Sequence, residues 1–354
     1  MSATIEGTRP SLEPTPIRAR RNVPIKFWAA LGAFQVGLFV YCVIAWAAAG
    51  QMTSTDPGPD KMSGLETGTM WVLTIGGAVA TTWCVWKFLW VPWRRDGRLN
   101  GDGMLLVGCF AMAIPHDIML MYASPSFSYN SHYANLGSWM SQVPGVQTPN
   151  AHNVPEPLIL VLPAYGWCVF LAAVLGCWLM RTIRDHRPET SSVGLVASTL
   201  VFFIVVDVFF ESALVYLHVQ AYTGSIGRLT LWEGTDHQLP LYEILFWAAF
   251  WTGMSALRFF RDDRGLTIAE RGVADMKLSA RKEIWLRQFA LIGAGFAAIT
   301  VLYNVPWALT SAHNDQFPQH LPSYLLNGIC SPDAAQATAD VPPCPNKSAA
   351  TFRG

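Results

Sequence analysis

Two carboxylates lie inside a long hydrophobic segment, where ionised groups are costly. The segment from Val193 to Leu217 carries Asp207 and Glu211, and His218 follows directly after it. At about 100° per residue, the three side chains project within roughly 40° of one another on one face of a helix. An ionisable side chain in a membrane span costs several kcal/mol unless it faces protein or water, and such residues mark functional sites by default. We therefore take this face as the first candidate site.

The spacing of the two acids suggests what chemistry they can do. They are four residues apart, so they repel each other when both are ionised. Burial then favours a state in which at least one of them carries a proton, which places a general acid beside a carboxylate. The alternative is a structural role, a buried hydrogen-bonded clasp between helices.

The composition of the chain is typical of an integral membrane protein. Hydrophobic residues make up 52% of its 354 residues and charged residues 14%, and the mean hydropathy is +0.28. A soluble domain carries about 25% charged residues. The sequence therefore predicts an all-α, polytopic membrane protein, a bundle of seven transmembrane helices. Each predicted span reaches the roughly 20 residues that a helix needs to cross a bilayer. The spans lie at 27–50, 69–91, 103–123, 156–180, 193–217, 240–260 and 286–306.

The distribution of Lys and Arg predicts the orientation of this bundle, because these residues gather in cytoplasmic loops. With the seven predicted spans, 20 of the 24 Lys and Arg residues fall on the side of the N-terminus. The other side holds only Lys61, Arg228, Lys347 and Arg353. We therefore expect a multi-pass protein of the cell membrane with its N-terminus in the cytoplasm and its C-terminus outside.

Two tails flank the predicted transmembrane domain, which covers residues 27–310. Residues 1–26 carry no apolar pattern and are expected to be a disordered cytoplasmic tail. Residues 311–354 form the predicted extracytoplasmic tail and contain Cys330 and Cys344. These two cysteines either pair as a disulfide, which an oxidising compartment favours, or stay free thiols.

The predicted outer loops are rich in aromatic, amide and acidic residues. They include the segments FSYNSHYANLGSW (127–139) and GSIGRLTLWEGTDHQLPLYE (224–243). Rings for apolar contact and Asn, His and Tyr for hydrogen bonds suit an oxygenated organic molecule. The alternative is an aromatic belt at the membrane interface together with ordinary capped turns. The substrate-binding candidates are Tyr129, Asn130, His132, Asn135, Trp139, His218, Trp232, Glu233, Tyr242 and Asn304.

Further polar groups are predicted at the depth of the buried acids. Glu211 lies about 9 Å and Asp207 about 15 Å below the outer end of their span, at a rise of about 1.5 Å per residue. His116 and Asp117 follow Pro115 in the third span, Glu156 opens the fourth and Glu243 opens the sixth. His116 and Asp117 could instead bond the backbone that the proline frees. Glu156 and Glu243 could cap their helices, and for Glu156 capping is the favoured reading.

Common catalytic signatures are absent from the sequence. It contains no HExxH, CxxC, GxSxG or phosphate-binding loop, and its eight histidines do not cluster as a membrane di-iron site requires. We expect no metal, no cofactor and no nucleic-acid partner. The remaining functions are acid and base catalysis without a cofactor, or the binding or transport of a hydrophobic molecule.

Several motifs resemble one known family. SYNSHYANLGSW, PEPLILVLPAY, DVFFESALVY and LTLWEG followed by PLYE, together with the seven-span layout, are similar to the avermectin spirocyclase (AveC-like) family of actinobacterial membrane proteins. The likeness extends over about residues 27–310. It implies formation of a spiroketal from a dihydroxy-ketone in polyketide secondary metabolism, and in some members a dehydratase activity. The resemblance assigns no catalytic residues to this chain.

The resemblance fits the chemistry that the buried acids suggest. Spiroketal closure needs a proton for a departing hydroxyl and a negative neighbour for the resulting oxocarbenium ion. Our hypothesis is that Asp207 and Glu211 form this pair and that His116, Asp117 or Glu243 relays protons. The expected partners are membrane lipids and a hydrophobic, hydroxylated ketide or lipid substrate.

Two other readings stay open. A terpenoid-type membrane cyclase or isomerase would use the same acids to protonate an alkene or an epoxide. A non-enzymatic lipid-binding protein or a proton-coupled transporter would use them as a proton relay.

Overall fold

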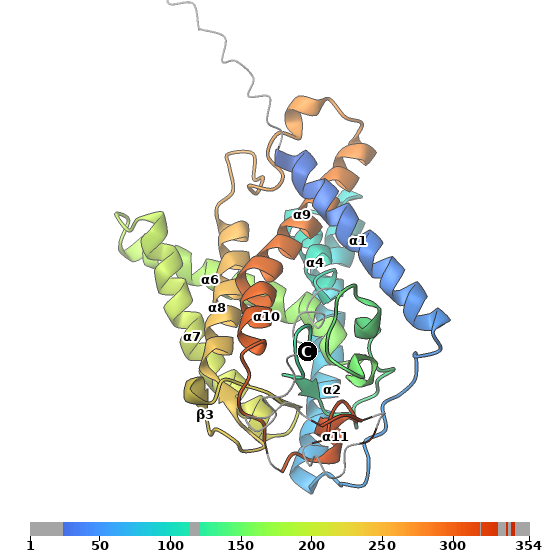
Figure 1. Ribbon diagram of the computed structural model, residues 1–354. Helices are drawn as coiled ribbons and strands as arrows, with labels where there is room; N and C mark the ends of the chain where they lie inside the picture. Colours follow the sequence, from blue (N-terminus) through green and yellow to red (C-terminus); the bar gives the residue numbers. More distant parts are fainter. Residues whose placement is uncertain (1–23, 114–120, 319, 332–337, 339–340, 344–354) are drawn as a thin grey trace, which may run out of the picture.

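The protein is mostly helical in its computed structural model (Figure 1). The structure describes residues 24–113, 121–318, 320–331, 338 and 341–343. Two helices continue through a π-helical stretch, α2 through η1 into α3 and α9 through η6 into α10. The helices are α1 (Pro24–Ala48), α2 (Gly64–Cys84), η1 (Val85–Trp90), α3 (Val91–Asp96), α4 (Gly101–Phe110), α6 (Val161–His186), α7 (Ser192–Tyr216), α8 (Leu241–Phe259), α9 (Ala280–Ile299), η6 (Thr300–Asn304), α10 (Val305–Ser311) and α11 (Ser323–Leu326).

Five helices of the described chain are long and apolar enough to cross a membrane. They span 24–48, 64–96, 161–186, 192–216 and 280–311. The third predicted span is represented by α4, whose described part has 10 residues. The sixth is represented by α8, a helix of 19 residues that lies among α6, α7 and α10 and is not one of the five (Figure 1). The predicted all-helical membrane fold is thus supported, whereas seven crossings and their orientation stay predictions.

Glycines set the closest helix contact, between α1 and α9. A Cβ atom added to Gly32 would lie 2.1 Å from the carbonyl oxygen of Phe289, and one added to Gly293 would lie 1.9 Å from that of Trp28. Side chains at these two positions would force the backbones apart. Small residues at such crossings are the usual device for close packing of membrane helices.

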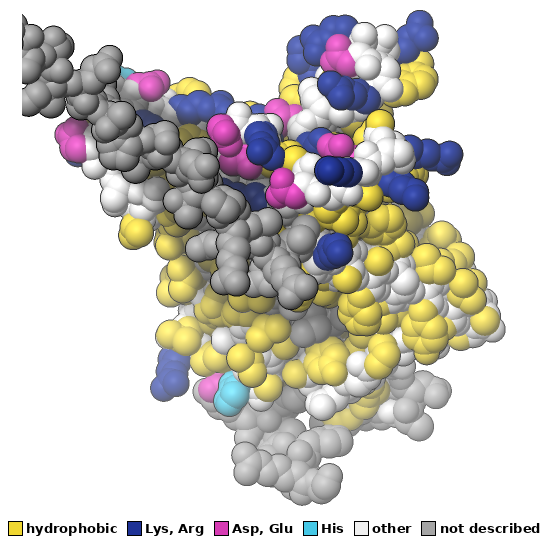
Figure 2. Space-filling model, turned by 90° about the horizontal axis from the view of Figure 1, so that it is seen from above, with side chains coloured by type: hydrophobic (Ala, Val, Ile, Leu, Met, Phe, Trp, Pro, Cys, Tyr) yellow, Lys and Arg dark blue, Asp and Glu magenta, His cyan; other side chains and the backbone are white. Residues whose placement is uncertain are grey.

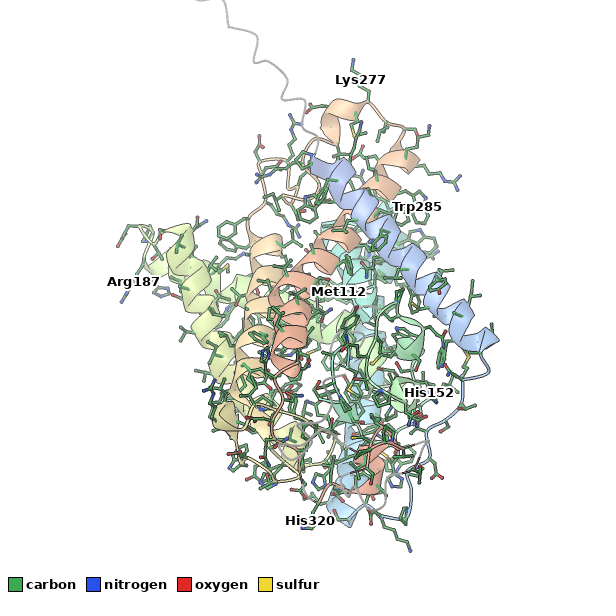
Figure 3. The ribbon with its side chains drawn as sticks, in the orientation of Figure 1. Met112, His152, Arg187, Lys277, Trp285 and His320 are labelled. Carbon is green, nitrogen blue, oxygen red and sulfur yellow. The ribbon has the colours of Figure 1, made fainter. Side chains whose placement is uncertain are left out.

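The two ends of the molecule differ in their side chains. Lys and Arg gather over the end where α1 and α9 begin, as Figure 2 shows in the view onto that end. In Figure 3, Lys277 lies at this end and His320 at the opposite one. Asp102 binds Arg258 at 2.7 Å and Arg261 at 2.8 Å there, which ties α4 to the end of α8. We call this the basic end.

Short strands and loops close the opposite end. β1 (Ser128–Tyr129) pairs antiparallel with β2 (Gln220–Ala221), and β3 (Thr230–Leu231) pairs with β4 (Leu239–Pro240). Next to α11, the Asn327 side chain donates to the Ser128 hydroxyl and to the Tyr129 carbonyl. The first part of the predicted C-terminal tail therefore packs against the helical domain. Short 3-10 turns complete this layer and the basic end. They are η2 (Trp139–Gln142), η3 (Ala151–Asn153), η4 (Gly227–Leu229) and η5 (Ala274–Met276).

The fourth helix begins later than the sequence predicted, so Glu156 does not cap it. α6 starts at Val161, and Glu156 lies in the preceding loop, buried to 1% exposure. Prolines on both sides of Glu156 explain the correction, because a residue before proline is driven out of the helical conformation. Cys330 is disulfide-bonded, and Cys344, its predicted partner, lies outside the described residues.

Candidate active site

A cavity of about 150 Å³ lies among the helices, toward the end with the short strands. Its walls come from α2, α6, α7, α8 and η6 and from the segments around β1 and β2. Most of the lining is apolar or aromatic, and two acidic residues from different helices reach it. The polar side chains in the wall are Tyr129, Tyr165, Glu211, Gln220, Tyr222, Glu243 and Tyr303.

Glu211, on α7, receives two short hydrogen bonds through one oxygen. Its Oε2 accepts from Gln220 Nε2 at 2.6 Å and from the Tyr222 hydroxyl at 2.8 Å. Both donors belong to the segment that folds back after α7 ends. Hydrogen bonds from neutral donors to a carboxylate stabilise its charged form. The surroundings of Glu211 are therefore built to hold an anion.

Glu243 occupies the first turn of α8 and is 2% exposed. Its Oε1 accepts a hydrogen bond of 3.3 Å from the Tyr303 hydroxyl, and its Oε2 has no partner among the described residues. Tyr222 also lies beside this carboxyl group. However, a phenol has a single proton, and Tyr222 donates it to Glu211. Glu243 therefore accepts fewer and longer hydrogen bonds from the described residues than Glu211 does.

Tyr222 stays a hydrogen-bond donor over a wide pH range. Burial raises the pKa of this phenol well above its usual value, and the nearby Glu211 and Glu243 carboxyl groups raise it further. The hydroxyl therefore remains protonated at neutral pH and stands between the two acids.

Asp207 lies one turn before Glu211 on α7 and is fully buried. It does not line the cavity, and neither of its oxygens has a hydrogen-bond partner in the described part of the chain. A buried carboxyl group without partners is costly when charged. The predicted hydrogen-bonded clasp for Asp207 is therefore not seen among the described residues.

Local backbone features bring these side chains together. α7 ends at Tyr216, and His218 adopts a left-handed conformation with φ of 48°. The chain then reverses into β2, so that Gln220 and Tyr222 reach back toward Glu211. Tyr303 lies in the π-helical stretch η6, and such stretches occur often at functional sites. Gln220, Tyr222 and Tyr303 are thus placed by a chain reversal after a helix end and by a π-helical stretch.

A family model for AveC-like spirocyclases matches residues 93–325, about two thirds of the chain. The chain belongs to the AveC-like spirocyclase family. The matched segment contains every residue of the cavity wall except Leu73. Comparisons with curated proteins and with solved structures find no significant match.

Glu211, Glu243 and Tyr129 are the predicted site residues of this AveC-like protein that line the cavity. His116 and Asp117 were predicted to relay protons, and they lie outside the described residues. His218 does not share the face of Asp207 and Glu211, because the helix ends before it. Its ring binds Glu66 at 2.5 Å and Asp236 at 3.3 Å instead.

Three predicted substrate-binding residues hold the loops together. The Asn135 side chain bonds four backbone groups, of residues 55, 131, 133 and 137. Asn130 donates to the carbonyl of His218 at 2.9 Å. Trp139 packs edge-on against Phe39 and Trp46 of α1. None of the three is in the cavity wall.

The other predicted binding residues also lie outside the wall of this cavity. His132 packs near Tyr324, and Trp232 and Glu233 lie beyond β3 on the surface. Tyr242 contacts Trp307, and Asn304 is fully buried in η6.

Sequence reasoning missed Gln220, Tyr165 and above all Tyr222, which touches both acids. Its position could have pointed to Tyr222, because Tyr222 follows shortly after the helix that carries Glu211. Among the described residues, no group of three or more His, Cys, Asp and Glu side chains is arranged to hold a metal ion.

Proposed function

We propose that this protein is a membrane-embedded spirocyclase that closes a hydroxylated ketone to a spiroketal by acid and base catalysis. The observation that carries the proposal is the cavity in which Glu211 and Glu243, from two helices, flank the hydroxyl of Tyr222. Membership of a family named for spirocyclases supports the reaction class. The reaction needs a proton donor and a carboxylate, and the two glutamates of the cavity can take these roles.

The two acids suit different roles. Glu211 accepts two short hydrogen bonds, so it acts as the carboxylate. Glu243 accepts one long hydrogen bond from Tyr303, and its Oε2 has no hydrogen-bond partner among the described residues, so it acts as the protonated acid. Placing two charges together in a water-poor cavity is unfavourable, which also favours one proton shared by the pair.

The reaction can be balanced with these residues alone. One substrate hydroxyl adds to the ketone and gives a hemiketal. Glu243 then donates its proton to the hydroxyl oxygen of the hemiketal, the bond from carbon to this oxygen breaks, and water leaves. The second hydroxyl attacks the oxocarbenium carbon and its proton passes to Glu211, which stabilises the cation beforehand. The Tyr222 hydroxyl, beside both acids, returns the proton from Glu211 to Glu243.

The wall of the cavity suits an apolar substrate that arrives from the bilayer. Lining side chains with remaining exposure include Leu73 on α2, Leu160 before α6 and Phe210 on α7, which is 42% exposed. These exposed apolar side chains support a cavity mouth on the apolar flank of the helices. We further propose that α4 and α8 complete a bundle of seven crossings, with the basic end in the cytoplasm.

The aromatic wall also suits a second reaction, cyclisation or isomerisation of a terpenoid. The rings of the wall residues Tyr303 and Trp247 have centroids 4.9 Å apart, and Tyr303 stacks on Trp307, which is not in the wall, with centroids 6.0 Å apart. Aromatic faces stabilise cations, and Glu243 could then protonate an alkene. The family makes spiroketal closure the preferred assignment.

A synthetic substrate tests the proposal. A symmetric aliphatic ketone with four methylene groups and a terminal hydroxyl on each side closes to a chiral six-six spiroketal with loss of one water. The full-length protein in lipid nanodiscs should form it faster than empty nanodiscs and in enantiomeric excess. Glu211→Gln should abolish the excess. Racemic product at the rate of empty nanodiscs would contradict the proposal.

A further inference from the structure

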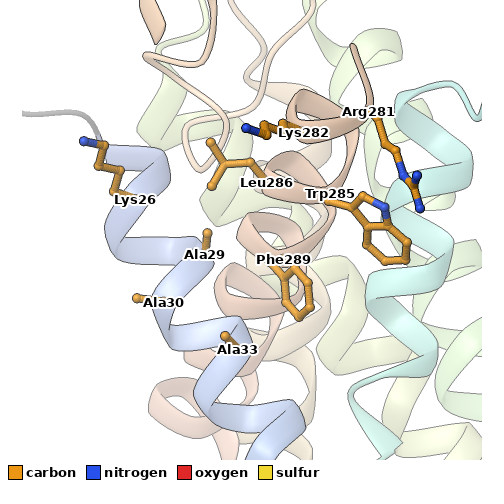
Figure 4. A pocket seen from close by; sticks show the side chains of 9 residues that line it. All are labelled: Lys26, Ala29, Ala30, Ala33, Arg281, Lys282, Trp285, Leu286 and Phe289. Atoms are coloured by element: carbon orange, nitrogen blue, oxygen red, sulfur yellow. The ribbon is translucent and has the colours of Figure 1, made fainter. Parts of the chain in front are cut away.

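A groove of about 640 Å³ opens between α1 and α9 at the basic end, far from the candidate active site (Figure 4). α1 contributes small residues and α9 contributes large apolar ones. The groove is lined by Lys26, Ala29, Ala30, Ala33, Arg281, Lys282, Trp285, Leu286 and Phe289.

Charge is concentrated at one end of this groove. Lys26 lies in the first turn of α1, and Arg281 and Lys282 lie in the first turn of α9, above the alanines in Figure 4. All three are exposed, and none forms an ion pair with another described residue. Among the described residues, no acidic side chain lines the groove. Three cations without an ion pair among the described residues therefore flank the opening, Lys26 on the side of α1 and Arg281 and Lys282 on the side of α9 (Figure 4).

The rest of the groove is apolar and runs along the helices. On α1 the exposed positions Lys26, Ala30 and Ala33 follow one another at helical spacing. From Lys26 to Ala33 the groove extends about 10 Å along the helix, at a rise of about 1.5 Å per residue. On α9, Trp285 is 56% exposed and flanks the same opening. The apolar part is thus long enough for the upper half of an acyl chain.

Packing explains why the groove stays open on this side. The loop before α9 covers another face of the two helices, where Ile25 packs with Leu266 and Val273. Below the groove, Gly32 and Gly293 hold the helices in contact. The alanines of α1 leave the space that larger residues would fill.

We propose that this groove binds an anionic phospholipid, with the headgroup phosphate among Lys26, Arg281 and Lys282 and an acyl chain along Ala30 and Ala33. The site has cations at one end of the groove and an apolar surface that continues from them along the helices. A basic cluster without the apolar groove would attract any anionic surface. An apolar groove without the cations would accept any lipid. The combination selects one molecule that carries both parts.

Native mass spectrometry of the full-length protein in detergent tests the proposal with phosphatidylglycerol and phosphatidylcholine as probes. The wild type should bind phosphatidylglycerol in preference to phosphatidylcholine. A basic residue near an anionic surface contributes about a fivefold change in binding. The variant Lys26→Gln/Arg281→Gln/Lys282→Gln should therefore lose on the order of 100-fold in affinity for phosphatidylglycerol.

A charge-matched control separates the groove from the general positive field. Arg264, Arg271 and Lys277 are exposed, lie in the loop before α9 and do not line the groove. Their triple replacement by Gln should change the affinity less than about threefold, because screening limits the reach of exposed charges. An equal loss in both triple variants would overturn the proposal.

Two further measurements test the apolar part. Ala30→Phe keeps the charge and fills the groove at an exposed position, so it should also weaken phosphatidylglycerol binding. Inorganic phosphate at millimolar concentration should not displace the lipid. Full displacement by phosphate, or equal binding of both phospholipids, would show that the site does not recognise an anionic lipid.

Discussion

Tyr222→Phe is the most informative single change, because it removes one hydroxyl and keeps the ring. That hydroxyl donates to Glu211 at 2.8 Å and lies beside Glu243. A hydrogen bond to a charged group contributes about 1.5–3 kcal/mol, which corresponds to roughly 10- to 100-fold in the population of the anion. We expect the rate of spiroketal formation in nanodiscs to fall by about this factor.

The pH dependence distinguishes this role from a structural one. A carboxylate that loses a donor holds its proton more tightly, so the acid limb of the pH–rate profile should move to higher pH in Tyr222→Phe. Tyr133→Phe is the matched control, since Tyr133 is buried and its hydroxyl has no partner among the described residues. It should keep the wild-type profile. A wild-type rate and profile in Tyr222→Phe would refute the assignment of Tyr222.

Further substitutions test the other parts of the account. Asp207→Asn should leave the thermal unfolding temperature unchanged or raise it, because an amide avoids a buried charge. It should slow cyclisation less than about tenfold. A complete loss of activity would place Asp207 in the reaction. Gly293→Ala should lower the free energy of unfolding by about 1–3 kcal/mol, as overpacking does, and Gly37→Ala, whose Cβ meets nothing within 4 Å, should not. Glu66→Gln weakens the contacts to His218 and Tyr324, so limited proteolysis after α7 should become faster; unchanged cleavage would show that these contacts do not hold the segment.

The sequence predicted the main helices because apolar length is a local property. α7 was predicted at 193–217 and lies at Ser192–Tyr216. The exact ends depend on turns, and these were harder to predict. His218 was assigned to the face of Glu211, yet its left-handed backbone directs it to Glu66. A helical projection cannot detect where a helix stops.

The sequence pointed to acidic residues of the cavity wall but not to the residues that bond them. Asp207 and Glu211 stood out because carboxylates in an apolar segment are rare, and Glu243 was predicted only as a proton relay or a helix cap. Of these three acids, Glu211 and Glu243 line the cavity and Asp207 does not. Tyr222 reaches them only because two residues of β2 pair with two residues of β1, more than 90 positions earlier in the chain. Strands of two residues are too short to show the alternating hydrophobic pattern by which a sequence reveals a strand. The outer-loop residues Asn135 and Trp139 stay predicted binding residues, and in the structure Asn135 bonds loop backbone while Trp139 packs against α1.

The central claim is that Glu211 and Glu243 act as one acid and base pair. The most direct test measures spiroketal formation and its enantiomeric excess in nanodiscs for Glu211→Gln, Glu243→Gln and the double variant. General acid and base catalysis contributes about 10²- to 10⁴-fold, so each single variant should lose on that order. Residues that act as a unit are not additive, and the double variant should be no slower than the slower single one. A wild-type rate in either single variant, or losses that multiply in the double variant, would contradict the account.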